Sequence, residues 1–289
     1  MNGSADAEGP LAIVCAGGTL PFTLAEAARR RGRGVFLYAL RGWADPEKVA
    51  PYPHEWGGLV QFGRFFRCAR RHGCRDVVFI GTLVRPSLWR LRPDLTGLLL
   101  APRIVSAFRG GDDHLLSALG RYVEENGFRI VGAHEIAPEL LVDEGPVGSI
   151  LPSDRDRGDI AVGLDVLGVT GRFDIGQAVV VAGNRVLAVE AAEGTDRMLE
   201  RLAALRRDGA VRWPAGTGVL VKAPKPGQNT RIDLPSVGPK TVEMAAAAAL
   251  AGIAVAARGT IIAEPQSVAA TADRTGLFVI GVMAAGPGQ

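Results

Sequence analysis

The stretch KAPKPGQNTRIDLPSVGPKT, Lys222 to Thr241, separates an apolar run at Val219–Val221 from an alanine-rich segment that begins near Thr241. The apolar run predicts a buried strand, and the alanine-rich segment predicts a helix. Six residues that interrupt regular structure lie between the two: Pro224, Pro226, Gly227, Pro235, Gly238 and Pro239. We therefore expect a stiffened loop without regular structure between two packed elements of an α/β domain.

This loop contains a single carboxylate, that of Asp233, among cationic and uncharged polar side chains. The cationic residues are Lys222, Lys225, Arg231 and Lys240, and the uncharged polar residues are Gln228, Asn229 and Thr230. Several cations around one acid suit an anionic phosphate ester held beside a metal ion or a positioned water molecule. A solvated connection with ordinary surface charges is the alternative, and the pattern alone leaves both open.

Length and composition indicate an α/β protein with two domains. The chain has 289 residues, of which 47% are hydrophobic and 38 are glycine, enough for two cores joined by short loops. A net charge of +3 disfavours a general nucleic-acid binder. No run of about 18 uncharged apolar residues is present, so we expect no membrane span.

The N-terminus and the cysteines indicate the cellular compartment. Met1–Pro10 is polar and acidic, so we expect a disordered leader and not a signal peptide. Cys15, Cys68 and Cys74 have no metal-ligand spacing and suit a reducing cytoplasm. Cys15 stands in an apolar run, where we expect it to belong to the core.

The first half of the chain opens with a β-α-β pattern. Leu11–Pro21 predicts a strand, a glycine turn and the start of a helix, and Val35–Leu40 predicts a second strand. This order favours a parallel, Rossmann-like sheet, and we assign residues 11–137 to that domain. Backbone amides at Gly17 and Gly18 could approach a ligand at the helix N-terminus. A tight structural turn is the alternative, because the G-x-G-x-x-G spacing is missing.

Arginines and leucines alternate in Thr82–Leu100. Arg85, Arg90 and Arg92 lie among leucines that end in the run Leu98–Leu100. Such a pattern suits a lipid chain beside an anionic head group. A helix packed on the sheet is the alternative. Further on, Phe128–Ile136 predicts a strand with the pair His134-Glu135 at its end. This pair lacks metal-site spacing, so we interpret His134 as a hydrogen-bonded structural histidine.

The second half begins after a loop. We expect a linker at residues 138–152, which are rich in proline and glycine, and an α/β catalytic domain at residues 153–285. Gln177–Asp196 predicts a hairpin followed directly by a helix.

The end of that hairpin carries further candidate site residues. Gly194 and Thr195 offer amides and a hydroxyl to a phosphate, and Glu190 and Glu193 could hold a divalent cation. Thr195 as a simple helix N-cap is the alternative.

Seven motifs occur in an order that resembles a known family. They are AGGTLP (Ala16–Pro21), RGGDD (Arg109–Asp113), GAHE (Gly132–Glu135), DIGQAVVV (Asp174–Val181), LAVEAAEGTD (Leu187–Asp196), VKAPKPGQNTRIDLPSVG (Val221–Gly238) and GLFVIGV (Gly276–Val282). On these motifs the chain resembles the LpxI-type UDP-2,3-diacylglucosamine pyrophosphatases of Gram-negative lipid A synthesis. The resemblance covers nearly all of the chain beyond Leu11.

The resemblance implies an activity and a mechanism. A magnesium-dependent hydrolase, using Mg²⁺ or Mn²⁺, would split UDP-2,3-diacylglucosamine into UMP and 2,3-diacylglucosamine 1-phosphate (lipid X). It would have two α/β domains joined by a linker, with the lipid product held between them. Asp233 matches the family position that is tied to catalysis.

The remaining site residues follow from the physical arguments above. Lys225 and Arg231 are expected to act with Asp233 in catalysis. Substrate contacts are expected from Gly17, Gly18, Gly194, Thr195, Lys222 and Gln228, and metal contacts from Asp233, Glu190 and Glu193. Whether Asp233 is a metal ligand or the base that orients water stays open.

These expectations place the protein in the cytoplasm, in transient contact with the inner face of the inner membrane, without nucleic acid. Assembly into a homodimer stays open. A UDP-sugar-binding transferase and a non-catalytic lipid- or nucleotide-binding protein are the alternative functions.

Overall fold

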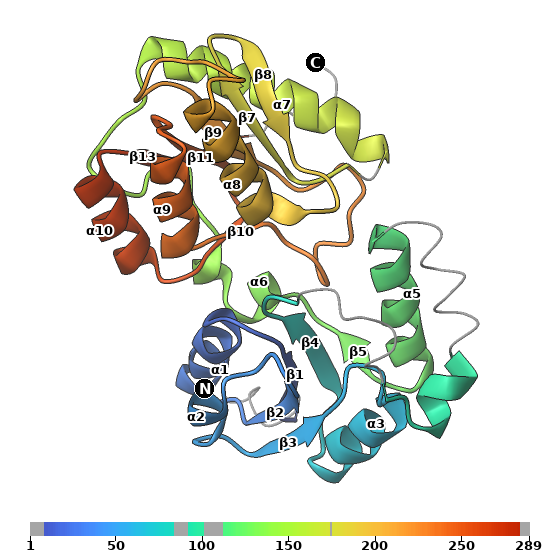
Figure 1. The fold of residues 1–289 in the computed structure, drawn as a ribbon. Coiled ribbons are helices and arrows are strands. Elements are labelled where there is room, and N and C mark those ends of the chain that lie inside the picture. Colours follow the sequence, from blue (N-terminus) through green and yellow to red (C-terminus); the bar gives the residue numbers. More distant parts are fainter. Residues whose placement is uncertain (1–8, 84–91, 101–111, 174, 284–289) are drawn as a thin grey trace. The chain divides into compact units, whose positions relative to one another are not determined.

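The computed structural model describes residues 9–83, 92–100, 112–173 and 175–283. The chain forms two compact units (Figure 1). The first unit contains Met1–Pro138 together with Asn229–Asp233, and the second contains Glu139–Gln228 and Leu234–Gln289. A five-residue segment of the second half of the chain therefore belongs to the first unit.

The first unit is built on a parallel sheet of five strands, which confirms the Rossmann-like prediction. In spatial order the strands are β3 (His54–Gly57), β2 (Val35–Leu40), β1 (Leu11–Cys15), β4 (Asp76–Ile80) and β5 (Arg129–Ile130). The helices are α1 (Leu20–Arg30), α2 (Pro46–Val49), α3 (Phe62–Arg71), α5 (Asp112–Glu125) and α6 (Ala133–Ile136), and residues 95–100 are also helical. The strand order reverses between β1 and β4, the position at which open α/β sheets usually bind ligands.

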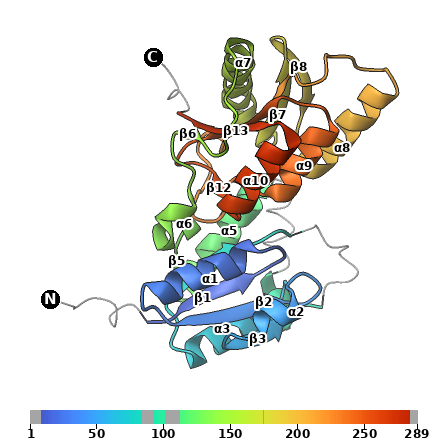
Figure 2. The same cartoon turned by 90° about the vertical axis from the view of Figure 1, so that its left-hand side faces the viewer.

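Side chains alternate across this sheet, so both of its faces are buried. Ala12 and Val14 face a core rich in phenylalanine, which includes Phe65 and Phe66 of α3. Leu11 and Ile13 point the other way and are fully buried. Figure 2 shows α1 and α3 on opposite faces of the sheet. Cys15 is buried as expected, and burial raises the pKa of its thiol to about 12.

Asp76, at the start of β4, is a buried acid with two arginine partners. Its carboxylate accepts hydrogen bonds from Arg129 Nε (2.7 Å) and Nη2 (2.8 Å), and from Arg33. Burial by itself raises the pKa of a carboxyl group. Here the hydrogen bonds from Arg129 and Arg33 outweigh burial, so the pKa of Asp76 lies below its ordinary value. Asp76 therefore links β4 to β5 and to the segment that precedes β2.

Replacing Asp76 by Asn should lower the free energy of unfolding at pH 7 by about 2 kcal/mol, because charge-assisted hydrogen bonds are stronger than neutral ones. Since the folded-state pKa is depressed, the contribution of Asp76 is complete above the unfolded-state pKa of about 4 and is lost as the pH falls through the folded-state pKa. Urea unfolding at decreasing pH should show the two proteins converging. Asp208→Asn is the control, since that side chain is 68% exposed. A difference that stays constant below pH 4 would contradict this account.

The second unit contains a mixed sheet of six strands. In spatial order they are β6 (Gly145–Pro146), β13 (Phe278–Val282), β11 (Gly252–Ala256), β9 (Val219–Lys222), β7 (Ala178–Ala182) and β8 (Arg185–Val189). The central strands β13, β11 and β9 are parallel, and β6, β7 and β8 pair antiparallel to their neighbours. Two short strands, β10 (Ser236–Val237) and β12 (Ile261–Ile262), form a separate parallel pair. The mixed α/β prediction for this half is confirmed.

Helices cover both faces of the mixed sheet (Figure 1). They are α7 (Asp154–Thr170), α8 (Gly194–Arg207), α9 (Pro239–Ala247) and α10 (Pro265–Thr275). Val179 and Val221 pack with α7 residues in one core, whereas Val180 and Leu220 pack with α8, α9 and α10 residues in another. None of the helices in the described ranges is long and apolar enough to cross a membrane.

Several boundaries differ from the sequence prediction. Within residues 138–152, which we expected to be a linker, Gly145–Pro146 pairs with β13, and the structure assigns residues from Glu139 onward to the second unit. Backbone pairing also gives part of the central loop regular structure, as strand β10. Residues 1–8 of the expected leader lie outside the described residues. Gly9 is described, and its carbonyl accepts a hydrogen bond from Arg33 Nε at 3.1 Å.

Two helices also depart from expectation for local reasons. Helix α9 begins at Pro239, two residues before the expected start at Thr241, because proline is favoured in the first turn. Beyond Ile130, the expected strand at Phe128–Ile136 turns into helix α6. The Glu135 carboxylate accepts the N–H of Gly132 at 2.7 Å, which stabilises this helix start.

Candidate active site

The central loop contributes residues to both units. Lys222 ends β9, and residues through Gln228 belong to the second unit. Asn229–Asp233, which we call the motif segment, belongs to the first unit, and Leu234 returns to the second. The predicted catalytic residues are therefore divided: Lys225 lies in the second unit, and Arg231 and Asp233 lie in the first.

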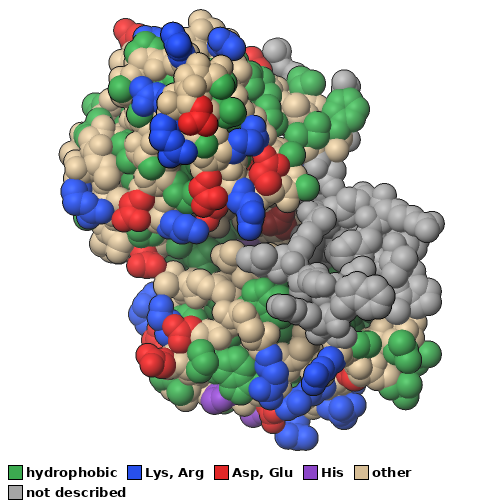
Figure 3. Space-filling model, viewed as in Figure 1, with side chains coloured by type: hydrophobic (Ala, Val, Ile, Leu, Met, Phe, Trp, Pro, Cys, Tyr) green, Lys and Arg blue, Asp and Glu red, His purple; other side chains and the backbone are tan. Residues whose placement is uncertain are grey.

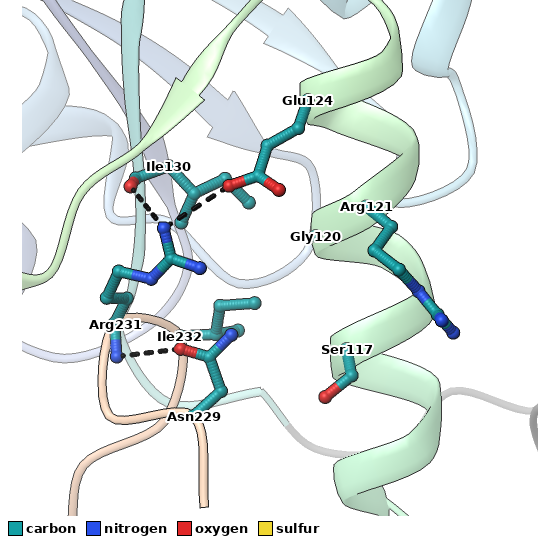
Figure 4. Close-up of a pocket in the computed structure, with 8 residues that line it drawn as sticks. All are labelled: Ser117, Gly120, Arg121, Glu124, Ile130, Asn229, Arg231 and Ile232. Atoms are coloured by element: carbon teal, nitrogen blue, oxygen red, sulfur yellow. Dashed lines mark hydrogen bonds and ion pairs between the residues drawn. The ribbon is translucent and has the colours of Figure 1, made fainter.

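Helix α5 and strand β5 hold the side chain of Arg231. Its Nη1 atom lies 3.3 Å from Glu124 Oε1 and 3.4 Å from the carbonyl oxygen of Ile130 (Figure 4). The Arg231 N–H donates to Asn229 Oδ1 at 3.2 Å. The guanidinium group is thus oriented by an acid and a carbonyl, and the Arg231 side chain as a whole is 43% exposed.

A pocket of about 380 Å³ lies between α5 and the motif segment. Its lining residues, drawn in Figure 4, are Ser117, Gly120, Arg121, Glu124, Ile130, Asn229, Arg231 and Ile232. Two arginines, a hydroxyl and an amide can together bind an anionic or polar group. The volume falls in the range of small-molecule sites.

Asp233 comes directly after Ile232, the last of the lining residues in sequence, and is partly buried. The N–H groups of Ile232 and Asp233 donate to the carbonyl oxygen of Asn229, at 3.0 and 3.1 Å. The motif segment is therefore a closed turn whose backbone sets the position of the Asp233 side chain.

Three of the predicted site residues in the second unit form a chain of hydrogen bonds. The Lys222 side chain is buried, and its Nζ donates to Thr195 Oγ1 and to the Ser236 carbonyl, both at 3.0 Å. The Thr195 hydroxyl donates to Glu190 Oε2 at 3.1 Å. Lys222, Thr195 and Glu190 are thus brought together, with the buried cation and the acid linked through the hydroxyl.

The structure also corrects the alternative role of Thr195. The N-cap of α8 is Glu193, and Thr195 lies inside the helix with its hydroxyl bonded as above. The amide of Gly194 donates to the Ala191 carbonyl at 3.2 Å. One of the two amides that we expected to anchor a phosphate therefore already has a partner within the protein.

Two of the three predicted metal ligands, Glu193 and Glu190, have partners within the second unit. Glu193 is paired with Arg201 at 2.7 Å, and hydrogen bonds from its own N–H and from Arg201 lower the pKa of its carboxyl group. Glu190 accepts from the Thr195 hydroxyl and from the Gln177 N–H. Within the described ranges, no group of three or more His, Cys, Asp or Glu side chains is arranged to hold a metal ion.

Lys225 and Gln228 close a turn in the first part of the loop. The Lys225 N–H donates to Gln228 Oε1 at 2.9 Å, and the Gln228 N–H donates to the Lys225 carbonyl at 3.1 Å. The Lys225 side chain is 8% exposed. Gln228 therefore shapes the loop around Lys225, a contact that the sequence pattern did not reveal.

The glycine turn after β1 lies at the point where the strand order reverses. Gly17 and Thr82 exchange two backbone hydrogen bonds, of 3.0 and 2.8 Å, so the amide of Gly17 already has a partner. Gly18 has φ +87°, a conformation that favours glycine. The turn joins the ends of β1 and β4 at the edge where a ligand would approach.

His134 lies beside the motif segment. A Cβ atom on Gly132 would lie 2.4 Å from His134 Cε1 and 3.2 Å from the Cα of Arg231. Among the described residues, the buried His134 Nδ1 has no hydrogen-bond partner. At this nitrogen, the expectation of a hydrogen-bonded structural histidine is therefore wrong.

Sequence reasoning missed the contribution of α5 to the pocket. Its lining residues occur at positions 117, 120, 121 and 124, a spacing that puts them on one face of a helix. The opposite face carries Leu119, Tyr122 and Val123, which pack in the core. This polar face is the signal that could have identified the pocket.

A first unit with a Rossmann-like parallel sheet and a second unit with a mixed sheet define the class of the chain as a two-unit α/β protein. Comparison with known proteins agrees with this class. The LpxI N-terminal domain family matches residues 10–140, and the LpxI C-terminal domain family matches residues 143–280. The UDP-2,3-diacylglucosamine pyrophosphatase LpxI of Caulobacter vibrioides is 43% identical over 272 residues, covering 94% of this chain and 97% of that protein. The chain belongs to the LpxI family.

Proposed function

We propose that this chain hydrolyses the pyrophosphate of UDP-2,3-diacylglucosamine to UMP and lipid X in lipid A biosynthesis. The observation that carries the proposal is the 43% identity, along nearly the whole length of both proteins, to a relative named for this activity. The cation-rich loop supports it, because pyrophosphate cleavage requires stabilisation of negative charge on the leaving phosphate.

Each part of the site has a proposed role. Asp233 orients the attacking water or contributes one metal ligand, since its carboxylate follows directly on a closed backbone turn. Arg231 and Lys225 stabilise the charge that develops on the phosphates. Lys222 and Thr195 form a second polar centre, at the end of β9. Gly18 shapes the turn where the first unit's sheet reverses its strand order.

A divalent cation of the magnesium type fits part of the predicted ligand set. Mg²⁺ commonly takes one or two protein carboxylates and completes its coordination with substrate phosphates and water. Asp233 would hold such an ion, whereas Glu193 is already paired with Arg201. When bound, the ion would supply neutralisation of the phosphate oxygens.

Incubation of the purified protein with UDP-2,3-diacylglucosamine tests the proposed reaction directly. Release of UMP together with lipid X is the expected result. A transferase would require an acceptor before UMP or UDP appeared, and a binding protein would leave the substrate intact. Either outcome would replace the proposal with one of those alternatives.

We also propose that the protein works in the cytoplasm and touches the inner face of the inner membrane. The three cysteines are buried and free, which suits a reducing compartment. Leu95, Leu98 and Leu99 lie three and four residues apart on the helix of residues 95–100, and are 75%, 60% and 74% exposed. Residues 84–91 of the Arg–Leu stretch, which include Arg85 and Arg90, lie outside the described residues.

The helix that carries these leucines adjoins a helix with exposed arginines. The helix of residues 95–100 adjoins α3, because Asp94 Oδ2 accepts the N–H of Arg64 at 2.8 Å. Arg67, Arg70 and Arg71 of α3 are exposed. Figure 3 shows Lys and Arg side chains gathered along the lower edge of the first unit, with hydrophobic side chains to their right. Exposed leucines beside arginines suit contact with anionic lipid.

Replacing Leu98 and Leu99 together by Ser should raise KM for the diacylated substrate about 10-fold, because each apolar contact with an acyl chain contributes roughly 1 kcal/mol or more. The melting temperature should not change, since both side chains are exposed. Leu100, which we had grouped with them, is 6% exposed and belongs to the core. Leu100→Ser should therefore lower the free energy of unfolding by about 3 kcal/mol.

Steady-state kinetics and thermal melting of the two variants separate a lipid contact from a structural role. Leu151→Ser is a matched control, because Leu151 is 61% exposed on the second unit. An unchanged KM in the Leu98/Leu99 variant would remove these leucines from substrate recognition.

A further inference from the structure

The side chain of Ile232 anchors the motif segment in the first unit. Ile232 packs against the core that contains the α3 and β5 residues. This contact is distant in sequence: the adjacent residue Arg231 donates a hydrogen bond to the carbonyl of Ile130, which lies 101 positions earlier in the chain. Gly120 of α5 lies directly against it, since a Cβ atom on Gly120 would be 2.7 Å from Ile232 Cδ1 and 3.4 Å from Ile130 Cδ1. Figure 4 shows the side chain of Ile232 pointing toward helix α5, on which Gly120 lies.

The glycine at position 120 has no explanation within its own helix. Gly120 lies in the interior of α5, where glycine is the least favourable residue after proline. Gly120 is not among the glycines of positive φ, so the backbone conformation does not require it. Its missing side chain instead leaves the space that the δ-methyl group of Ile232 occupies.

The contact is transmitted to Asp233 through a short, closed turn. Both Ile232 and Asp233 donate their N–H groups to the Asn229 carbonyl. Arg231, on the other side of Ile232, is held by Glu124 and by the Ile130 carbonyl. The Ile232 side chain, packed between Gly120 and the core, is therefore a contact that links helix α5 to the backbone that carries Asp233.

We propose that Gly120 and Ile232 are positioning residues, whose contact fixes Asp233 in its active placement on the first unit. This inference rests on the proposed function for the part that Asp233 plays in catalysis. Neither residue needs to touch the substrate. Displacements of about 1 Å are enough to slow an enzyme substantially, because reacting groups must stay aligned.

Three variants test the contact by adding and removing single carbon atoms. Gly120→Ala adds a Cβ atom where Ile232 Cδ1 lies, and should lower kcat about 10-fold. Ile232→Val removes Cδ1 and should change kcat less than 3-fold. The double variant should recover the kcat of Ile232→Val, because the added and the removed carbon atoms compensate. Gly168→Ala is the matched control, since a Cβ atom there meets nothing within 4 Å in helix α7.

A measurement independent of activity separates this inference from the proposed function. Hydrogen exchange of the full-length protein reports on the amides of Ile232 and Asp233. Gly120→Ala should speed their exchange, with the melting temperature unchanged or higher, and the double variant should restore slow exchange. If exchange follows this pattern while kcat stays at the wild-type value, Gly120 and Ile232 do position the motif segment. The catalytic role that we propose for Asp233 would then be wrong.

Two outcomes would overturn the inference itself. One is unchanged exchange in Gly120→Ala. The other is a double variant whose loss of kcat equals the product of the two single losses, because independent effects would multiply without compensation.

Discussion

Replacing Asp233 by Asn should lower kcat by about 10²- to 10⁴-fold, the range expected when a positioned acid–base group is lost. The substitution keeps the size of the side chain and removes its charge. The backbone turn that holds residue 233 should persist, because its hydrogen bonds run from main-chain N–H groups to the Asn229 carbonyl. Substrate Kd should stay the same or fall, since a carboxylate near a pyrophosphate repels it in the ground state.

Variants of two cationic residues should behave differently from Asp233→Asn, which separates a catalytic role from a binding role. Arg231→Ala and Lys225→Ala should raise the substrate Kd as well as lower kcat, because their charges meet phosphate both before and during the reaction. The melting temperature of each variant serves as the folding control. Near-normal kcat in a folded Asp233→Asn protein would take this residue out of the mechanism, and with it the catalytic role of the central loop.

Removing divalent metal should abolish most of the turnover, with a loss of about 10²-fold or more, because a pyrophosphate needs its charge neutralised before water can attack. Protein treated with EDTA and then dialysed should regain activity with Mg²⁺ or Mn²⁺ in the millimolar range. We expect no tightly held zinc, since the sequence has no Cys/His cluster with metal-ligand spacing, and the carboxylate of Asp233 suits hard cations.

Thermal melting with and without EDTA provides the control for this experiment. An unchanged melting temperature would show that the lost turnover reflects the missing ion and not an unfolded protein. Full turnover without added metal, by protein stripped of divalent ions, would contradict the proposed requirement.

Local patterns were sufficient for the elements with continuous apolar runs. Strands β1, β2, β4 and β7 are long, buried and bounded by turn residues, so each was recognisable from its own residues. Strand β3 was missed, because His54–Gly57 has no apolar run and depends on pairing with β2. Strands of two residues, such as β10, exist only through their partners.

The sequence singled out several residues that the structure brings together, and it missed part of their surroundings. Lys222, Thr195 and Glu190 were all singled out, and the structure brings them together through hydrogen bonds. Glu124 was not singled out, because it is 107 positions away in sequence from Arg231, with which it forms a hydrogen bond. The polar face of α5 marks a surface, but nothing near Glu124 in sequence identifies Arg231 as its partner.

The sequence by itself determined the α/β class, the alternation of buried strands and helices, and the loop with its cations around Asp233. These features depend on apolar periodicity and on breaking residues, which act over a few positions along the chain. Only the tertiary structure decided that Asn229–Asp233 belongs to the first unit. The physical reason is that Ile232 finds its apolar surroundings, and Arg231 its acid, among residues about 100 positions away, and burial is specified by the assembled core and not by neighbours in sequence.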